Sequence, residues 1–328
     1  MPREAPGESR ATVLPPAPQD GAHALSETKP LQPVSVIVVN YNGGALLGEC
    51  IAAALDQAAQ VIVVDNGSTD SSIEALEERF PGYARLVVER AGTNLGFAAG
   101  CNRGMAHATQ PLLLFLNPDC VLDAASLQHM AETLHQDARI GMVGGLLANP
   151  DGSEQGACRR ALPTPWRSFV RAFGLARLSR RWPRAFPDFH LDSQALPAAP
   201  TDVEAISGAL MLVRRTAIDA VGPWDEAYFL HCEDLDWCMR FRQHGWRVVF
   251  DPAARAVHQK GHCSRSQPVF VEWHKHKGML RFYRKFFRDR YPVVVTWAVA
   301  GGIWLHFGQV SARHLARRLL GRQASRDR

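Results

Sequence analysis

Short apolar runs alternate with amphipathic segments along the first half of the chain. The apolar runs are typical of buried strands and cover residues 34–39, 61–64, 86–89, 111–116 and 142–147. The segments between them carry apolar residues at helical spacing and predict helices over residues 45–57, 68–79, 96–109 and 124–136. This alternation predicts an α/β fold built on a doubly wound, mostly parallel sheet.

The rhythm is lost over residues 150–204, which we interpret as an irregular basic insertion. Within it, apolar side chains at Trp166, Phe169, Val170 and Phe173 share one face of a basic amphipathic helix. Such a helix is either an ordinary surface helix or a contact with a membrane interface. Regular structure returns with a strand over residues 204–213, a helix over 233–244 and a strand over 247–250.

Polar residues stand where three of the predicted strands end, at Asn40, Asp65 and Asp119. In a doubly wound sheet, ligands bind beyond the carboxyl ends of the strands, so these side chains belong to one rim. Asp65 can accept the imide N–H of a uracil or thymine ring, or bond a ribose hydroxyl, and Gly67 lets the backbone approach a ligand. An Asx turn between strand and helix is the alternative for Asp65.

A carboxylate at a strand end can also hold a divalent cation and its phosphates. Asp119 is the candidate, and Mg²⁺ or Mn²⁺ is the cation that suits hard oxygen ligands. His258, expected just after a strand, could complete the metal shell as a neutral imidazole. Asn117 is neutral and is expected to orient the site or contact the sugar.

A second acidic pair opens the helix predicted over residues 233–244. Asp234 shares a face with Trp237, Cys238 and Phe241, so it should point inward, whereas Glu233 lies on a face more compatible with solvent. Burial raises the pKa of a carboxylate and suits it to general-base chemistry, which makes Asp234 the predicted base. The alternative is a pair of first-turn acids that complement the helix dipole.

Seven segments, in order along the chain, resemble the inverting family 2 glycosyltransferases of GT-A fold, and within them the bacterial rhamnosyltransferase-like branch. They are residues 36–42, 64–70, 94–102, 117–119, 207–209, 233–236 and 258–264. The resemblance implies that Asp65 binds the nucleobase, that Asp119 binds the metal and diphosphate with help from His258, and that Asp234 is the base. Asn117 departs from the fuller Asp-x-Asp pattern, which leaves metal dependence open.

The same resemblance assigns the remaining site residues and the substrates. The predicted nucleotide-sugar site comprises Asn40, Asn42, Asp65, Gly67, Asn94, Gly96, Asn102 and Asn117. The predicted acceptor side comprises Gly208, Ala209 and Trp237, and Glu233 accompanies Asp234 in catalysis. The expected donor is a dTDP- or UDP-linked sugar, with dTDP-rhamnose first. The expected acceptor is a hydroxyl of a glycan or lipid-linked saccharide in cell-surface polysaccharide synthesis.

Composition adds the compartment and the partners. The 328 residues are 46% apolar with a net charge of +5, enough for one large domain with additions. Seven cysteines without framework spacing indicate a reducing compartment. Three basic clusters, over residues 159–184, 274–290 and 313–328, suggest contact with anionic lipid or phosphate, or else solvated cationic faces. We therefore expect the cytoplasm or a peripheral position on the cytoplasmic face of the inner membrane, and no nucleic-acid partner.

The predicted domains are a disordered tail over residues 1–32, a transferase domain over 33–270 and a basic, amphipathic helical extension over 271–328. The tail lacks the apolar region of a signal peptide. Within the extension, Pro292–Gly308 is apolar but short for a spanning helix, so we expect an interfacial or re-entrant helix.

Other classes fit less well. A sugar-1-phosphate nucleotidyltransferase needs a basic, Gly-rich loop after the first strand, and residues 40–44 are Asn-Tyr-Asn-Gly-Gly. A nicotinamide oxidoreductase needs the dinucleotide fingerprint, which segment 94–102 lacks. Zinc is disfavoured because Cys232 and Cys238 would not converge on a helix. A non-catalytic scaffold stays open, although candidates for base, metal and nucleobase are all present.

Overall fold

The computed structural model describes residues 30–187, 189, 191–192, 194–259 and 267–324. The predicted tail over residues 1–32 lies almost wholly outside this range and stays a prediction, as do the domain boundaries at 270 and 271. The account below concerns the compact unit that begins at Leu31.

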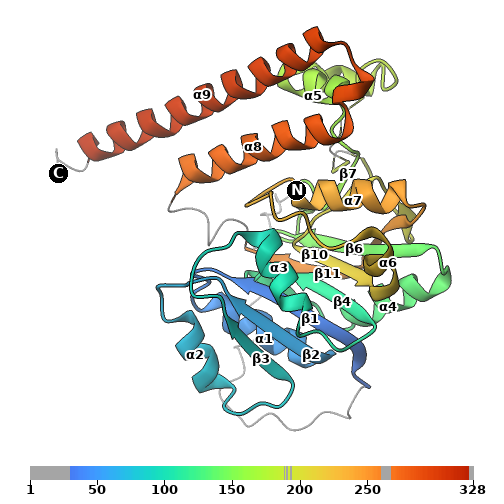
Figure 1. Ribbon diagram of the computed structural model, residues 1–328, viewed down its shortest axis with the longest axis vertical. Helices are drawn as coiled ribbons and strands as arrows, with labels where there is room; N and C mark the ends of the chain where they lie inside the picture. The colour runs from blue at the N-terminus through green and yellow to red at the C-terminus, as the bar shows by residue number, and fades with distance from the viewer. Residues whose placement is uncertain (1–29, 188, 190, 193, 260–266, 325–328) are drawn as a thin grey trace, which may run out of the picture. The chain divides into compact units, whose positions relative to one another are not determined.

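The elements follow the predicted alternation (Figure 1). The strands are β1 (Gln32–Asn40), β2 (Ala58–Asp65), β3 (Leu86–Arg90), β4 (Leu112–Leu116), β5 (Cys120–Leu122), β6 (Ile140–Ala148), β7 (Arg159–Arg160), β8 (Thr201–Asp202), β9 (Ala205–Ile206), β10 (Leu210–Arg214) and β11 (Arg247–His258). The α-helices are α1 (Leu46–Leu55), α2 (Ser72–Arg79), α3 (Phe97–Met105), α4 (Ser126–Gln136), α5 (Pro165–Ala172), α6 (Arg215–Val221), α7 (Glu233–Gln243), α8 (Pro268–Phe286) and α9 (Val293–Ala324). Short 3₁₀ turns occupy Leu175–Arg180 and Arg288–Arg290.

One large sheet organises these elements, in the order β3-β2-β1-β4-β10-β6-β11-β5. Strands β3, β2, β1 and β4 run parallel, and so do β6 and β11. Strand β10 lies antiparallel between β4 and β6. The predicted α/β fold with a mostly parallel sheet is confirmed, and the antiparallel strand at its centre is the feature that a doubly wound pattern does not predict.

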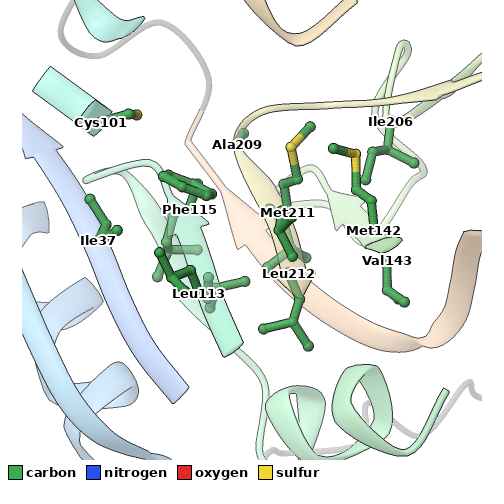
Figure 2. Close-up of a cluster of buried hydrophobic side chains, with 14 of the residues drawn as sticks. Ile37, Cys101, Leu113, Phe115, Met142, Val143, Ile206, Ala209, Met211 and Leu212 are labelled. Atoms are coloured by element: carbon green, nitrogen blue, oxygen red, sulfur yellow. The ribbon is translucent and has the colours of Figure 1, made fainter. Parts of the chain in front are cut away.

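The core lies where helices cover this sheet. Figure 2 shows the side chains of β4, β10 and β6 next to one another, with Phe115, Met211 and Met142 among those labelled. All three are completely buried. Their near-continuous apolar runs are expected of strands that are covered on both faces. Helix α3 packs closely on β1, where Gly100 and Gly104 face Val39 and Ile37.

Two predicted strands differ from the structure. The strand expected over residues 204–213 is two strands, β9 and β10, separated by a turn at Ser207–Ala209. The strand expected over 247–250 continues to His258, with an irregularity between Asp251 and Arg255. His258 is therefore the last residue of β11, paired with Cys120 of β5, and does not follow the strand. The apolar pattern does not predict these features, because Gly208 and Pro252 interrupt the run of apolar residues while the flanking residues still pair in the sheet.

Helices α8 and α9 form the end of the described chain and pack against each other. Helix α9 is continuous from Val293 to Ala324 and is longer than the predicted apolar segment, and the interfacial or re-entrant position expected for that segment stays a prediction. Arginine is a good helix former, and the basic residues after Gly308 extend the helix instead of ending it. Its stretch Val293–Ala316 is long and apolar enough to cross a membrane, and none of it is buried.

The close approach of α3 to β1 predicts the effect of a small substitution. A Cβ at Gly104 would lie 2.5 Å from Ile37 Cγ2 and 3.2 Å from Val64 Cγ2. We expect Gly104→Ala to lower the free energy of unfolding by about 1–3 kcal/mol through overpacking, measured by urea denaturation. Gly308→Ala is the matched control, because it also lies in a helix but has no atom within 4 Å of the added carbon. Equal stability of the two variants would contradict the packing argument.

Candidate active site

The strand ends predicted to share a rim do so in the structure. Asn40 and Asp65 are register partners at the ends of β1 and β2. Strand β4 lies on the other side of β1, and Asn117 and Asp119 follow directly after it. The sheet order therefore brings four of the predicted polar residues to its carboxyl edge.

Asn40 and Asn42 tie the loop after β1 to the loop after β2. The Asn40 side chain is fully buried and donates to the hydroxyls of Ser68 and Ser72 at 3.0 and 2.9 Å. Asn42, at φ 54°, accepts hydrogen bonds from the backbone N–H groups of Thr69 at 2.7 Å and Asp70 at 3.3 Å. Both asparagines were predicted to bind the nucleotide sugar. In the structure, their side chains hold together the two loops that border the predicted site.

Asp65 lies in the turn that these asparagines support. Its Oδ1 accepts the backbone N–H of Ser68 at 3.1 Å, which is the Asx turn considered as the alternative. The described residues offer its second oxygen no hydrogen-bond donor, so the carboxylate retains an acceptor for a ligand. Gly67 has φ 76°, and a Cβ there would lie 2.9 Å from the Thr93 backbone. This glycine allows the loop before α3 to close over the turn.

The loop before α3 is held by Asn94, Asn66 and Gly96. Asn94 Oδ1 accepts from Asn66 Nδ2 at 3.1 Å and from the Gly96 N–H at 3.0 Å. Gly96 has φ 86°, and a Cβ there would lie 2.5 Å from the Phe229 carbonyl oxygen. Only glycine fits at this crossing. The crossing places the start of α3 against the segment that leads into α7.

The side chain of Asn102, which was predicted to bind the nucleotide sugar, is engaged by hydrogen bonds within the chain. Its amide donates to the Trp224 carbonyl at 3.0 Å and to Glu226 Oε1 at 2.8 Å, and it accepts the Trp224 N–H at 3.0 Å. These bonds leave little capacity for a ligand. Asn102 joins α3 to the segment before α7.

Asp119 and His258 come together although they are far apart in sequence. Pairing of β5 with the end of β11 brings His258 Nε2 within 3.1 Å of Asp119 Oδ1, and both side chains are buried. Cys120 is also close, and the three residues form a group that could hold a metal ion. Burial and the charge of Asp119 raise the pKa of the Cys120 thiol, so it stays neutral and is a poor ligand for a hard cation.

Gln155 fixes the state of the histidine. Its Nε2 donates to the His258 carbonyl at 2.9 Å and to Asn149 Oδ1 at 3.1 Å, so its Oε1 must face the ring. That oxygen lies 2.7 Å from His258 Nδ1, which therefore carries the proton. In the neutral imidazole the lone pair is then on Nε2, beside Asp119. Two electron-pair donors 3.1 Å apart match adjacent ligands of one cation, as Asp119 and His258 were predicted to be.

Asp234 stands at the start of α7 in an ion pair with Arg160 of β7. Its Oδ2 also accepts the backbone N–H of Gly208 at 3.3 Å, and its Oδ1 accepts that of Leu235 at 2.8 Å. The side chains of both Asp234 and Arg160 are 14% exposed. The predicted base is thus a partly buried carboxylate with a reachable edge.

Glu233 is buried, and the prediction that it faces solvent is wrong. The two residues before it, His231 and Cys232, both have left-handed backbones with φ 69° and 72°, and they turn the first helical residue inward. Burial, followed by the charge of Asp234, raises the pKa of Glu233 to about 8. A raised pKa was expected for Asp234, the predicted base, and the structure gives it to its neighbour Glu233.

Of the three residues predicted on the acceptor side, two line the turn beside Asp234 and one does not. Gly208 donates to Asp234, and the Ala209 carbonyl accepts the Asn117 N–H at 3.1 Å. Trp237 is completely buried, donates its ring N–H to the Gly222 carbonyl at 2.9 Å and packs 4.1 Å from the Trp224 ring. It cannot contact an acceptor, so that prediction is wrong.

Comparison with known proteins identifies the family. The sequence model of glycosyl transferase family 2 matches residues 35–189, and the model of glycosyl transferase family group 2 matches residues 175–301. The chain belongs to the family 2 glycosyltransferases. It is 29% identical over 284 residues to the N-acetylglucosaminyl-diphospho-decaprenol L-rhamnosyltransferase of Mycobacterium tuberculosis. The aligned region covers 82% of this chain and 90% of that protein.

Solved structures show the same fold. The mannosyltransferase PcManGT from Pyrobaculum calidifontis, in complex with GDP-Man and Mn²⁺, superposes with a TM-score of 0.53 at 17% identity, covering 91% of this chain and 81% of that one. GalNAc-T7 with UDP, GalNAc and Mn²⁺ gives a TM-score of 0.51 at 16% identity, over 69% of this chain and 43% of that one. These likenesses confirm the predicted GT-A fold.

Two residues of this glycosyltransferase site were not predicted, Gln155 and Arg160. Both lie in the irregular insertion, where no periodicity guides an assignment. A chemical signal exists for Arg160 alone, because a buried carboxylate at Asp234 requires a cationic partner, whereas this rule does not point to Gln155. Among the described residues, Cys232 and Cys238 join no group of side chains that could hold a metal ion, and the prediction against zinc stays a prediction. His262 and Cys263 lie outside the described part.

The burial of Glu233 predicts how the stability of the transferase varies with pH. A carboxyl whose pKa is about 8 in the folded chain and 4.5 otherwise holds its proton more tightly when folded. The folded state then loses stability as pH rises from about 4.5 to about 8. We expect Glu233→Gln to remove part of this loss, so that its melting temperature exceeds that of the wild type at pH 8.5 by several degrees more than at pH 5.5.

The matched control for this measurement is Glu78→Gln, an exposed carboxylate on α2. It should leave the pH profile of the melting temperature unchanged. If the melting temperatures of Glu233→Gln and the wild type differed by the same amount at every pH, Glu233 would be ionised at neutral pH in the folded chain.

Proposed function

We propose that this transferase moves a sugar from a nucleoside diphosphate to an acceptor hydroxyl with inversion at the anomeric carbon. The observation that carries the proposal is the buried pair of Asp119 and His258, oriented by Gln155, at the same sheet edge as Asp65. Asp234 supplies a carboxylate next to this edge through the turn at Gly208.

Asp119 and His258 would hold one divalent cation, Mg²⁺ or Mn²⁺. The fit rests on the 3.1 Å separation of Asp119 Oδ1 and His258 Nε2 and on the tautomer that Gln155 imposes. A bound cation would neutralise charge that develops on the leaving diphosphate. Asn117 lies two residues before Asp119, and we assign it to the sugar or diphosphate because its side chain carries no charge.

Asp234 would act as the general base. It accepts the proton of the acceptor hydroxyl while that oxygen bonds to the anomeric carbon. The bond from this carbon to the diphosphate oxygen breaks at the same time, on the opposite side, which inverts the configuration. The Gly208 N–H and Arg160 hold the carboxylate in place for this step. Glu233, with its raised pKa, would keep a neutral carboxyl behind the base and spare it a second negative charge.

For the donor we propose dTDP-rhamnose first and a UDP-sugar second. Rhamnose as the donor sugar is supported by the similarity to the mycobacterial rhamnosyltransferase, because the alignment with it covers most of both chains. Asp65 would accept the imide N–H that uracil and thymine share. For the acceptor we propose a hydroxyl of a lipid-linked saccharide, since the name of the same relative includes a diphospho-decaprenol.

We further propose that the enzyme works at the cytoplasmic face of a membrane. Support comes from the exposed apolar side chains of α9, such as Val294 and Trp297 at 73% and 74% exposure, and from those of α5, such as Phe169. The basic cluster over residues 159–184 contributes less than expected. Arg159, Arg160 and Arg167 form ion pairs within the chain, with Glu154, Asp234 and Glu204.

Nucleotide binding gives the first test. A ligand that binds only the folded chain raises its melting temperature. We expect dTDP or UDP to do so in the presence of Mn²⁺, and GDP and CMP to have little effect. Asp65→Ala should abolish the shift, whereas Asp56→Ala, an exposed carboxylate at the end of α1, should keep it. A shift of equal size with all four nucleotides would contradict the role of Asp65.

Turnover tests the base. We expect Asp234→Asn to lower kcat by about 10²–10⁴-fold, the usual contribution of a general base, and to leave the nucleotide-induced thermal shift intact. Release of nucleoside diphosphate from the donor with a lipid-linked acceptor is the measurement. Asp219→Asn, an exposed carboxylate on α6, is the control. Near-normal turnover of a well-folded Asp234→Asn protein would remove Asp234 from this role.

A further inference from the structure

A cavity of about 710 Å³ lies where α8, α9 and the segment before α7 meet. Its wall contains four basic side chains from α8, two tryptophans and one acid, Asp225. The basic residues are Lys277, Arg281, Arg284 and Lys285. None of them belongs to the nucleotide-sugar site described above, so this cavity is a second candidate site.

Two of the four cations are already neutralised. Arg281 donates to Asp225 at 2.8 and 3.0 Å. Lys285 bridges Asp225 and the fully buried Asp236 of α7, at 2.8 and 2.7 Å. Burial alone would raise the pKa of Asp225, but the hydrogen bonds from Lys285 and Arg281 outweigh it and lower this pKa to about 2. These pairs therefore persist at neutral pH and fix one side of the cavity.

The other two cations have no such partner. In the described part of the chain, no acidic group pairs with Lys277 or Arg284, and both are exposed to the cavity mouth. They lie seven residues apart on α8, which is two helical turns and therefore one face. The cavity wall thus carries two positive charges without an acidic partner on one face of α8, about 10 Å apart along the helix axis at 1.5 Å per residue, and such charges attract an anionic ligand.

The aromatic residues indicate the surroundings of that anion. Trp273 of α8 and Trp304 of α9 line the cavity with ring centroids 5.1 Å apart, and Trp273 is 43% exposed. Exposed apolar residues continue from this point along α9, among them Val294, Trp297 and Leu305. Tryptophan next to lysine and arginine, at the edge of an exposed apolar helix, is the composition of a membrane–water interface.

We propose that this cavity binds the anionic phosphate of a membrane lipid. Lys277 and Arg284 contact the phosphate, Trp273 and Trp304 lie at the headgroup level, and the exposed face of α9 lies against the acyl chains. Basic pockets beside membrane helices bind lipid headgroups in this way. The proposal rests on the membrane-side acceptor proposed above, and it adds the site at which the lipid is held.

The cavity is connected to the catalytic segment by direct contacts. Lys285 reaches Asp236, two residues after Asp234 on α7. Gly278 of α8 packs on the turn before α7, where a Cβ would lie 2.7 Å from the His231 carbonyl oxygen. A lipid held between α8 and α9 would therefore lie beside the segment that carries the proposed base. This placement suits either the diphosphate of a lipid-linked acceptor or the headgroup of an anchoring phospholipid.

Vesicle binding by the full chain tests the proposal and separates the two sources. Three vesicles are compared in the absence of nucleotide: phosphatidylcholine alone, phosphatidylcholine with phosphatidylglycerol, and phosphatidylcholine with a polyprenyl diphosphate. The cavity variant is Lys277→Ala/Arg284→Ala. The control is Arg79→Ala/Arg139→Ala, which removes two exposed arginine charges from other parts of the protein.

We expect the cavity variant to bind at least one of the two anionic vesicles about tenfold or more weakly than the wild type, and the control to bind within about threefold. A loss confined to polyprenyl diphosphate identifies the acceptor as the source, and a loss that includes phosphatidylglycerol identifies the headgroup. Equal binding by the two variants, or no preference of the wild type for either anionic vesicle, would overturn the proposal. If the double variant melts below the wild type, Lys277→Gln replaces it.

Failure here can be told apart from failure of the proposed function. The nucleotide-induced thermal shift is measured on the same samples and does not involve the cavity. A normal shift with charge-independent vesicle binding overturns the lipid site alone. A missing shift overturns the nucleotide-sugar site, whatever the vesicles show.

Discussion

The turn at Ser207–Ala209 is the contact on which the geometry of the site depends. It exists because β10 enters the sheet antiparallel, between two strands that run the other way. The Ala209 carbonyl accepts the Asn117 N–H, which fixes the loop that carries Asp119. One residue earlier, the Gly208 N–H reaches Asp234. A single turn thus sets the metal-side loop and the proposed base at a fixed spacing, although they lie more than a hundred residues apart.

The segment after β6 supports both halves of the site from behind. Gln155 orients His258, and Arg160 compensates the charge of Asp234. Gln155 and His258 are buried, and the side chains of Arg160 and Asp234 are each only 14% exposed. An unpaired polar atom at these positions would cost more free energy than one exposed to water. The insertion lacks a helix or strand pattern in its sequence because these residues make their main contacts with distant partners and not with their local neighbours. Its first part belongs to the site, and only its later part, around α5, presents apolar rings to the exterior.

What the sequence predicts well is whatever depends on local pattern. The strand ends carrying Asn40, Asp65 and Asp119 follow from the apolar runs before them, and parallel pairing then places them on one edge. Prediction fails where several layers cover an element. Helix α7 packs against the sheet on one side and α8 on another, so Glu233 and Leu235 are both buried although they point to opposite sides of the helix, and a one-faced helix would expose one of them. The positions of the long-range partners Gln155 and Arg160 could not be derived, because no spacing rule links them to the residues they contact, even though a cationic partner for Asp234 is expected on chemical grounds.

The paired tryptophans near the base have an optical consequence. Trp224 and Trp237 lie 4.1 Å apart at an angle of 34°, and Phe115 packs edge-on against both. Two indoles this close share their electronic transitions, so they should give a coupled near-ultraviolet circular dichroism band that neither would give alone. One ring belongs to α7 and the other to the segment that Asn102 joins to α3. The intensity of that band therefore reports how firmly α7 packs against the segment bonded to α3, without any label.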